Sequence, residues 1–235
     1  MKINEKLLER MVEEALSETP VPPRREKRLE EAYVVQSKKF DVKTDSLSEK
    51  SRAAHQELLD GYVKALNEVS AQLDTADREG ANPNNSAFRN LKIDEAHNLN
   101  AAFLHGLFFD NVGSPSSRVT VDSMAYMRLA RDWGDFNKWQ KDFIACGMSA
   151  RNGWVVTCYS TFLKRYINVV VDLHCLNVPF GCIPIIVVDC WEHTYYADYL
   201  KDRKSYIYAM MRELNWGKIE ERVEKAERIA KVVMS

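Results

Sequence analysis

An aspartate and a histidine four residues apart are the first pair in this sequence with the chemistry of metal ligands. Asp189 ends the apolar run Ile185-Ile-Val-Val, and His193 follows it in Asp189-Cys-Trp-Glu-His193. A strand ending at Asp189 and a helical turn after it would bring one carboxylate and one imidazole to the same side. Two interpretations stay open for this spacing: a pair of metal ligands at a strand end, or a capping aspartate beside an unrelated surface histidine.

His105 is the second residue of this kind, because it lies in a strongly apolar stretch. Residues 88–111 are rich in Leu, Ala and Phe, and they are expected to form a helix on which Ala101, His105 and Phe108 occupy adjoining faces. Burying an imidazole without a partner would cost roughly a few kcal/mol. His105 is therefore either a ligand or a core histidine whose hydrogen bonds are satisfied.

The hydrophobic pattern and its breaks predict the elements that must position these residues. A helix capped by Ser48 should run to Leu73, and a second helix should follow the polar loop 80–86. Beyond the break at 113–117 the pattern changes to shorter elements. These are helices near 121–130 and 135–150, β-rich runs at 154–159, 165–172 and 183–189, and closing helices at about 203–214 and 217–233.

This order of elements predicts an α+β fold in two parts. Residues 40–116 are expected to form an N-terminal helical hairpin domain, and residues 117–235 a C-terminal α/β domain with a small antiparallel three-stranded sheet. Residues 1–39 precede them as a helical leader and a Pro-rich tether. The leader is either a docking helix for a protein partner or a frayed terminal helix packed on its own domain.

Composition is that of an ordinary globular protein and argues against several functions. The 235 residues carry 33 Lys and Arg against 34 Asp and Glu, so the strongly basic domain of a nucleic-acid binder is absent. No apolar stretch is long enough for a membrane span, and the N-terminus lacks the apolar core of a secretory signal. Five cysteines without CxxC spacing indicate reduced thiols, and a cytoplasmic protein is expected.

The residues around Asp189 carry a resemblance to a known family. The run Asp189-Cys-Trp-Glu-His193-Thr-Tyr195-Tyr196-Ala-Asp198-Tyr199 resembles the D-x-W-E-H-x-Y-Y-x-D-Y signature of the iron/manganese superoxide dismutases. Three further segments resemble other parts of that family, namely His105-Gly-Leu-Phe108-Phe109, Tyr62-Val63-Lys-Ala-Leu66-Asn67 and Gly153-Trp154. The resemblance covers about residues 45–230 and leaves the leader outside.

The resemblance implies one Mn or Fe ion per chain between the two halves, with Mn or a site that works with either metal favoured. The implied ligands are His55, His105, Asp189 and His193. His55 stands seven residues before Tyr62, whereas the family has a spacing of eight. Seven residues turn a helix to within roughly 20° of two whole turns, so His55 and Tyr62 would still face one site.

The same resemblance implies two catalytic residues besides the ligands. Tyr62 corresponds to the family's gate tyrosine, which helps to relay protons, and His174 to a loop residue that holds the metal-bound solvent. Iron-type members supply a glutamine for this purpose where Ala101 stands, and the alanine leaves room for His174. His97 matches no ligand and is expected to be structural or exposed.

Pocket and interface residues are implied in the same way. Phe109, Trp154 and Trp191 would form the pocket wall and keep the site dry. Glu192 and Tyr195 would lie at the interface of a homodimer, where the glutamate reaches the partner's ligand histidine.

The implied function is the disproportionation of superoxide to dioxygen and hydrogen peroxide. The alternative is a structural or interaction protein on the same fold, with a weak or empty metal site and the leader as its attachment to a larger assembly. Leu58 replaces a histidine and Val156 a tryptophan of the family pattern, and both changes affect the tuning of the site more than the fold. A metal-dependent hydrolase is disfavoured, because no further carboxylate pair offers a base.

Overall fold

The structure covers most of the chain. The structure is a computed structural model and describes residues 34–113 and 117–233. The predicted leader therefore lies outside the described residues as far as position 33, and its docking role stays a prediction, as does a domain boundary near 116. Among the described helices, none is both long enough and apolar enough to cross a bilayer.

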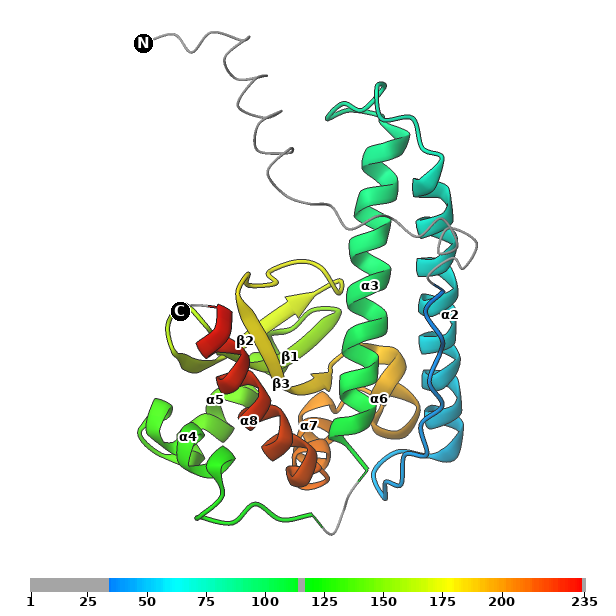
Figure 1. Cartoon of the computed structure of the whole chain (residues 1–235). Helices are drawn as coiled ribbons and strands as arrows, with labels where there is room; N and C mark the ends of the chain where they lie inside the picture. The colour runs from blue at the N-terminus through cyan, green and yellow to red at the C-terminus, as the bar shows by residue number, and fades with distance from the viewer. Residues whose placement is uncertain (1–33, 114–116, 234–235) are drawn as a thin grey trace, which may run out of the picture. The chain divides into compact units, whose positions relative to one another are not determined.

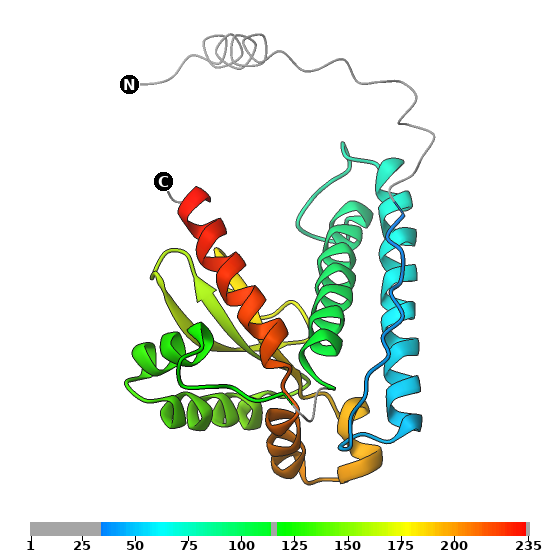
Figure 2. The same cartoon turned by 60° about the horizontal axis from the view of Figure 1, so that its bottom comes forward.

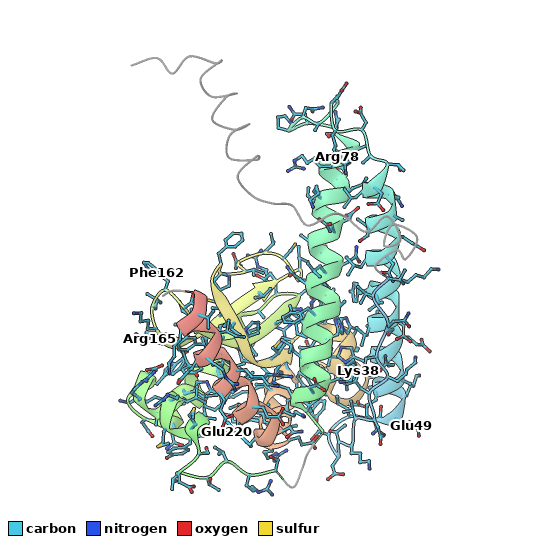
Figure 3. The ribbon with its side chains drawn as sticks, viewed as in Figure 1. Lys38, Glu49, Arg78, Phe162, Arg165 and Glu220 are labelled. Carbon is cyan, nitrogen blue, oxygen red and sulfur yellow. The ribbon has the colours of Figure 1, made fainter. Side chains whose placement is uncertain are left out.

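Two long helices form the N-terminal half. α2 spans Glu49–Asp74 and α3 spans Ala87–Asn111, close to the predicted ranges. Ser48 and Ser86 cap them, each accepting a hydrogen bond from a backbone N–H of the first turn. The helices lie side by side as a hairpin, and Arg78 lies in the loop that connects them (Figures 1, 2 and 3).

A small sheet forms the centre of the C-terminal half. β1 spans Gly153–Ser160, β2 Arg165–Asp172 and β3 Cys182–Asp189, and all pairs are antiparallel in the order β2-β1-β3. The turn between β1 and β2 carries Phe162, which points away from the sheet (Figure 3). Trp154 on β1 pairs with Asp189 on β3, so the register brings these two candidate site residues to one end of the sheet.

Helices cover the sheet and complete the core. Their bounds are Met124–Trp133 for α4, Phe136–Ser149 for α5, Glu192–Tyr199 for α6, Arg203–Arg212 for α7 and Trp216–Val233 for α8. α5 packs against β1 and β2, α8 packs against β3 and β1, and α3 packs against β3 (Figure 1). One continuous hydrophobic core runs from the hairpin through the sheet to α8. The predicted α+β fold, with a helical N-terminal part and a three-stranded antiparallel sheet, is confirmed.

Gly153 is required where β1 approaches β2 most closely. A Cβ atom at this position would lie 2.1 Å from the backbone carbonyl oxygen of Val171, well inside van der Waals contact. On the other side of β1, the Gly153 carbonyl accepts a hydrogen bond from the Cys190 N–H at 2.8 Å, which continues the ladder with β3 past Asp189. The backbone that carries Asp189 is therefore fixed on both sides of the site.

Candidate metal centre

Four elements bring together the four residues that the resemblance names as ligands. His55 comes from α2, His105 from α3, Asp189 from the end of β3 and His193 from the start of α6. Their potential ligand atoms all lie within 4.8 Å of one another. α2 is regular through His55 and Tyr62, and both rings pack against His105, with centroids 4.9 and 5.2 Å from its ring. The spacing of seven thus places both side chains at one site.

One carboxylate oxygen is the point on which the imidazoles converge. Oδ2 of Asp189 lies 3.0 Å from Nε2 of His55, 3.3 Å from Nε2 of His193 and 3.8 Å from Nε2 of His105. Asp189, His55 and His105 are buried, whereas the side chain of His193 is 26% exposed. The cluster therefore lies inside the protein with one open edge, at His193.

The protein holds Asp189 in one orientation. Its Oδ1 accepts a hydrogen bond from the backbone N–H of Trp191 at 2.9 Å, and its backbone carbonyl accepts one from the Tyr206 hydroxyl at 2.7 Å. Burial alone would raise the pKa of Asp189, but hydrogen bonds from His193 and His55 lower it, and the carboxyl is ionised. A fixed negative charge therefore faces the three imidazoles.

The protonation of His105 is the feature that calls for a cation. Nδ1 of His105 lies 2.6 Å from the backbone carbonyl oxygen of Ala101, which only accepts, so the ring proton is on Nδ1. Burial, together with the neighbouring His55, lowers the pKa of His105 to about 3, so the ring is neutral. Nε2 then presents a lone pair toward the Asp189 carboxylate, and this buried atom has no hydrogen-bond partner among the described residues.

Two lone-pair donors that face each other without a proton between them suit a bound metal ion. Burial also lowers the pKa of His55, so this imidazole is neutral, as metal ligation requires. Three imidazoles and one carboxylate form a mixed nitrogen and oxygen donor set of the kind that Mn and Fe accept. The residues present therefore fit the Mn or Fe ion that the resemblance implies, although their role as ligands stays a prediction.

Each predicted wall residue packs on a different candidate ligand. The ring of Phe109 lies 4.9 Å from that of His55, and the ring of Trp154 lies 4.9 Å from that of His105. Trp191 stacks on His193 at 5.6 Å with an interplanar angle of 25°. These contacts limit the directions in which the imidazoles can turn and exclude water from the buried side of the cluster.

Hydrogen bonds also set the tautomer of His174. The indole Nε1–H of Trp154, which can only donate, lies 2.9 Å from Nδ1 of His174. Burial lowers the pKa of His174 to about 4, so the ring is neutral and its proton is on Nε2. Nε2–H then donates to the Tyr62 hydroxyl at 3.1 Å. His174 sits in the left-handed backbone region at φ 62°, a conformation that its packing in the β2–β3 loop maintains.

The two predicted interface residues differ in exposure. Glu192 is exposed at the start of α6, beside the open edge of His193. Tyr195 is buried, stacks on Tyr206 at 5.2 Å and accepts a hydrogen bond from Arg203 at 3.2 Å. A second copy of the chain could contact Glu192 directly, whereas the described contacts of Tyr195 lie within its own chain. The interface role of both stays a prediction.

The sequence reasoning missed His97. Its ring lies 4.9 Å from that of His174 and 6.1 Å from that of Tyr62, so it touches the two residues implied in catalysis. The signal that could have found it is the spacing of eight residues to His105, which places the two imidazoles about 80° apart, on adjoining faces of one helix. The support of the Asp189 carbonyl by Tyr206 was also missed, and no sequence pattern indicates that contact.

Comparisons with known proteins show which family this chain resembles. The family described as iron/manganese superoxide dismutases, C-terminal domain, matches residues 122–222. The iron superoxide dismutase of Aquifex pyrophilus is 34% identical over 169 residues, which is 71% of this chain and 78% of that protein. Superoxide dismutase [Mn] 2 of Haloferax volcanii is 33% identical over 71% of this chain and 81% of its own length. The iron superoxide dismutase of Cupriavidus metallidurans is 31% identical over 80% of this chain and 93% of its own length.

Proposed function

The chain belongs to the iron/manganese superoxide dismutase family, and on that premise we propose that it disproportionates superoxide at one Mn or Fe ion held by His55, His105, Asp189 and His193. The observation that carries the proposal is the bare Nε2 lone pair of His105, buried and facing the Asp189 carboxylate at 3.8 Å. Relatives named as iron enzymes and relatives named as manganese enzymes are similarly identical to this chain, at 34% and 33%. The choice between Mn and Fe is therefore part of the test.

The reaction transfers one electron between two superoxide ions and consumes two protons. The side chains of the protein deliver the protons. The ion that His55, His105, Asp189 and His193 would hold would supply the one-electron redox chemistry that couples the oxidation of one superoxide to the reduction of another. The overall change is two superoxide ions and two protons to dioxygen and hydrogen peroxide. Asp189 contributes a negative charge at the ligand set, and His55 and His105 contribute neutral donors. The choice of charge and hydrogen bonds at such a site tunes its potential.

Tyr62 is the residue that gives a proton to the reduced product in this proposal. Its oxygen accepts the Nε2–H of His174, so the phenolic proton is left free to be given to the reduced product. Trp154 enforces that direction by donating to the other nitrogen of His174. Burial raises the pKa of Tyr62, with Asp189 adding to the effect, so the phenol keeps its proton until a stronger base arrives.

In this proposal the protein works as a homodimer in the cytoplasm. The open edge of His193 and the exposed Glu192 beside it support a second copy that covers the site at this edge. The free state of the five cysteines supports a reducing compartment. Size-exclusion chromatography with light scattering tests the dimer, and a monomer at micromolar concentration would contradict it.

The test loads the purified full-length protein separately with Mn and with Fe, and measures bound metal by elemental analysis and superoxide turnover by a rapid-mixing assay. We expect about one ion per chain and turnover with at least one of the two metals. His193→Ala should lose both, with the fold kept, because this ligand is the one that is partly exposed. His97→Gln is the matched control for metal binding, since it removes an imidazole that contacts no candidate ligand and should keep the ion.

Two results would overturn the proposal. Full turnover in His193→Ala would mean that the cluster is not the site of reaction. Wild-type protein that holds one Mn or Fe ion per chain but gives no turnover would mean that the cluster serves a different, structural purpose.

A further inference from the structure

His97 forms a triangle of ring contacts with the two residues that handle the proton. Its ring centroid lies 4.9 Å from His174 and 6.1 Å from Tyr62, and these two lie 5.1 Å from each other. The three side chains come from α3, α2 and the β2–β3 loop. The family resemblance assigns no role to His97, and its contacts therefore need a separate explanation.

Burial separates one of the three residues from the other two. His174 is buried, whereas Tyr62 and His97 are both half-buried. Within the described part of the chain, His97 makes no hydrogen bond or ion pair, so its ring nitrogens are free to bind water. His97 is thus an imidazole in contact with solvent on one side and with the Tyr62–His174 pair on the other.

The hydrogen bonds of His174 exclude it as the source of new protons for Tyr62. Its Nδ1 is occupied by the Trp154 indole N–H, and its single proton is already donated to Tyr62. Giving that proton away would leave an imidazolate anion in a buried site. After Tyr62 has lost its own proton, the replacement must come from the solvent side, and His97 is the titratable side chain that contacts Tyr62 there.

We propose that His97 returns protons from solvent to Tyr62 during turnover, as the outer residue of a His97–Tyr62–His174 group. This rests on the proposed function. A proton leaves the His97 imidazolium, crosses a bridging water and reaches the Tyr62 phenolate oxygen, which becomes a phenol again. The neutral His97 then takes a proton from solvent. Histidine suits this step because it is the side chain that ordinarily changes charge between about pH 5 and 8.

Among the described residues, the titratable side chains whose rings contact His97 are Tyr62 from α2 and His174 from the β2–β3 loop. Asp94 is exposed and precedes His97 by three residues on the same helix.

The kinetic test compares His97→Gln with the wild type, both loaded with the metal that supports turnover. Glutamine keeps polar contacts but cannot carry a proton. We expect kcat to fall about tenfold, below the effect of a direct proton-transfer group because water can partly replace His97. The kcat/KM at low superoxide should stay within about twofold. Added imidazole buffer should restore kcat, and Leu99→Gln, which places the same side chain at an exposed position of α3, should change neither constant.

A second measurement is independent of activity. In protein with ¹³C-labelled histidine and loaded with diamagnetic Zn²⁺, which binds His and Asp ligands, the ring signal of His97 is followed against pH. The midpoint of this signal should move in Tyr62→Phe, because the water-bridged hydroxyl is lost. An unmoved midpoint, or a His97→Gln protein with the kcat and pH profile of the wild type, would overturn the proposal. Wild-type protein without turnover would refute the proposed function instead, and the NMR result would then decide the His97 coupling alone.

Discussion

Trp154→Phe removes the hydrogen bond that the Trp154 indole donates to His174 of the His97–Tyr62–His174 group. The lost indole N–H leaves the buried Nδ1 of His174 without a partner, which should cost roughly 1–3 kcal/mol of unfolding free energy. The smaller ring adds a cavity term. More important, the ring proton of His174 can then sit on either nitrogen, and its donation to Tyr62 is no longer enforced. We expect superoxide turnover to fall by about tenfold or more.

Trp139→Phe is the matched control for this substitution. Trp139 is also fully buried, and its indole N–H donates to the Thr157 hydroxyl at 3.0 Å, away from the candidate ligands. Both variants lose the same atoms from the core, so their urea-unfolding free energies should drop by comparable amounts. Only Trp154→Phe should change turnover.

Two assays separate the effect on stability from the effect on the tautomer. Urea unfolding gives the loss of stability, and ¹⁵N NMR of labelled histidine in Zn²⁺-loaded protein reports which nitrogen of His174 carries the proton. A Trp154→Phe protein in which His174 keeps its proton on Nε2 and turnover stays at the wild-type level would refute the reasoning. Equal losses of turnover in the Trp154 and Trp139 variants would refute it as well, because a general loss of packing would then explain both.

Three further predictions concern stability. Gly153→Ala should lower the unfolding free energy by about 1–3 kcal/mol or more, because its Cβ would lie 2.1 Å from the Val171 carbonyl oxygen. Gly61→Ala should raise it by about 0.5–1 kcal/mol, because Gly61 is exposed on α2 and an added Cβ would meet no neighbouring group within 4 Å. Urea unfolding of both variants checks the contrast. Burial opposes ionisation of Glu227, but hydrogen bonds from Arg128 lower its pKa below the ordinary 4.5, so the wild type should be more stable than Glu227→Gln above that pH and lose its advantage as the pH falls further. Equal differences in urea midpoint at pH 7 and pH 3 would contradict this. Chelation of the metal should lower the thermal midpoint, since an ion at 100 times its Kd stabilises the folded state by about 2.7 kcal/mol. An unchanged midpoint by calorimetry would mean that the ion has no preference for the folded state.

The sequence by itself was enough for the elements and for local groups of residues. Hydrophobic periodicity and the Ser48 cap predicted α2 to within a residue, and the β-rich runs predicted the three strands. The geometry of short spacings is local, so spacing alone places Asp189 with His193, and His55 with Tyr62, on common faces. The family resemblance then supplied the expectation that these two groups meet.

Only the tertiary structure decided how those groups meet and which atoms face each other. The proton on Nδ1 of His105 and the one on Nε2 of His174 follow from the Ala101 carbonyl and the Trp154 indole, and the second of these contacts joins segments 20 residues apart. The contact of His97 with His174 joins α3 to a loop beyond two strands. Periodicity records which face of an element is buried, but the partner of that face depends on how the hairpin packs against the sheet. That packing is a property of the whole chain. For this reason the hydrogen bonds of His174 with Trp154 and Tyr62, and the ring contacts of His97 with His174 and Tyr62, could be read only from the folded protein.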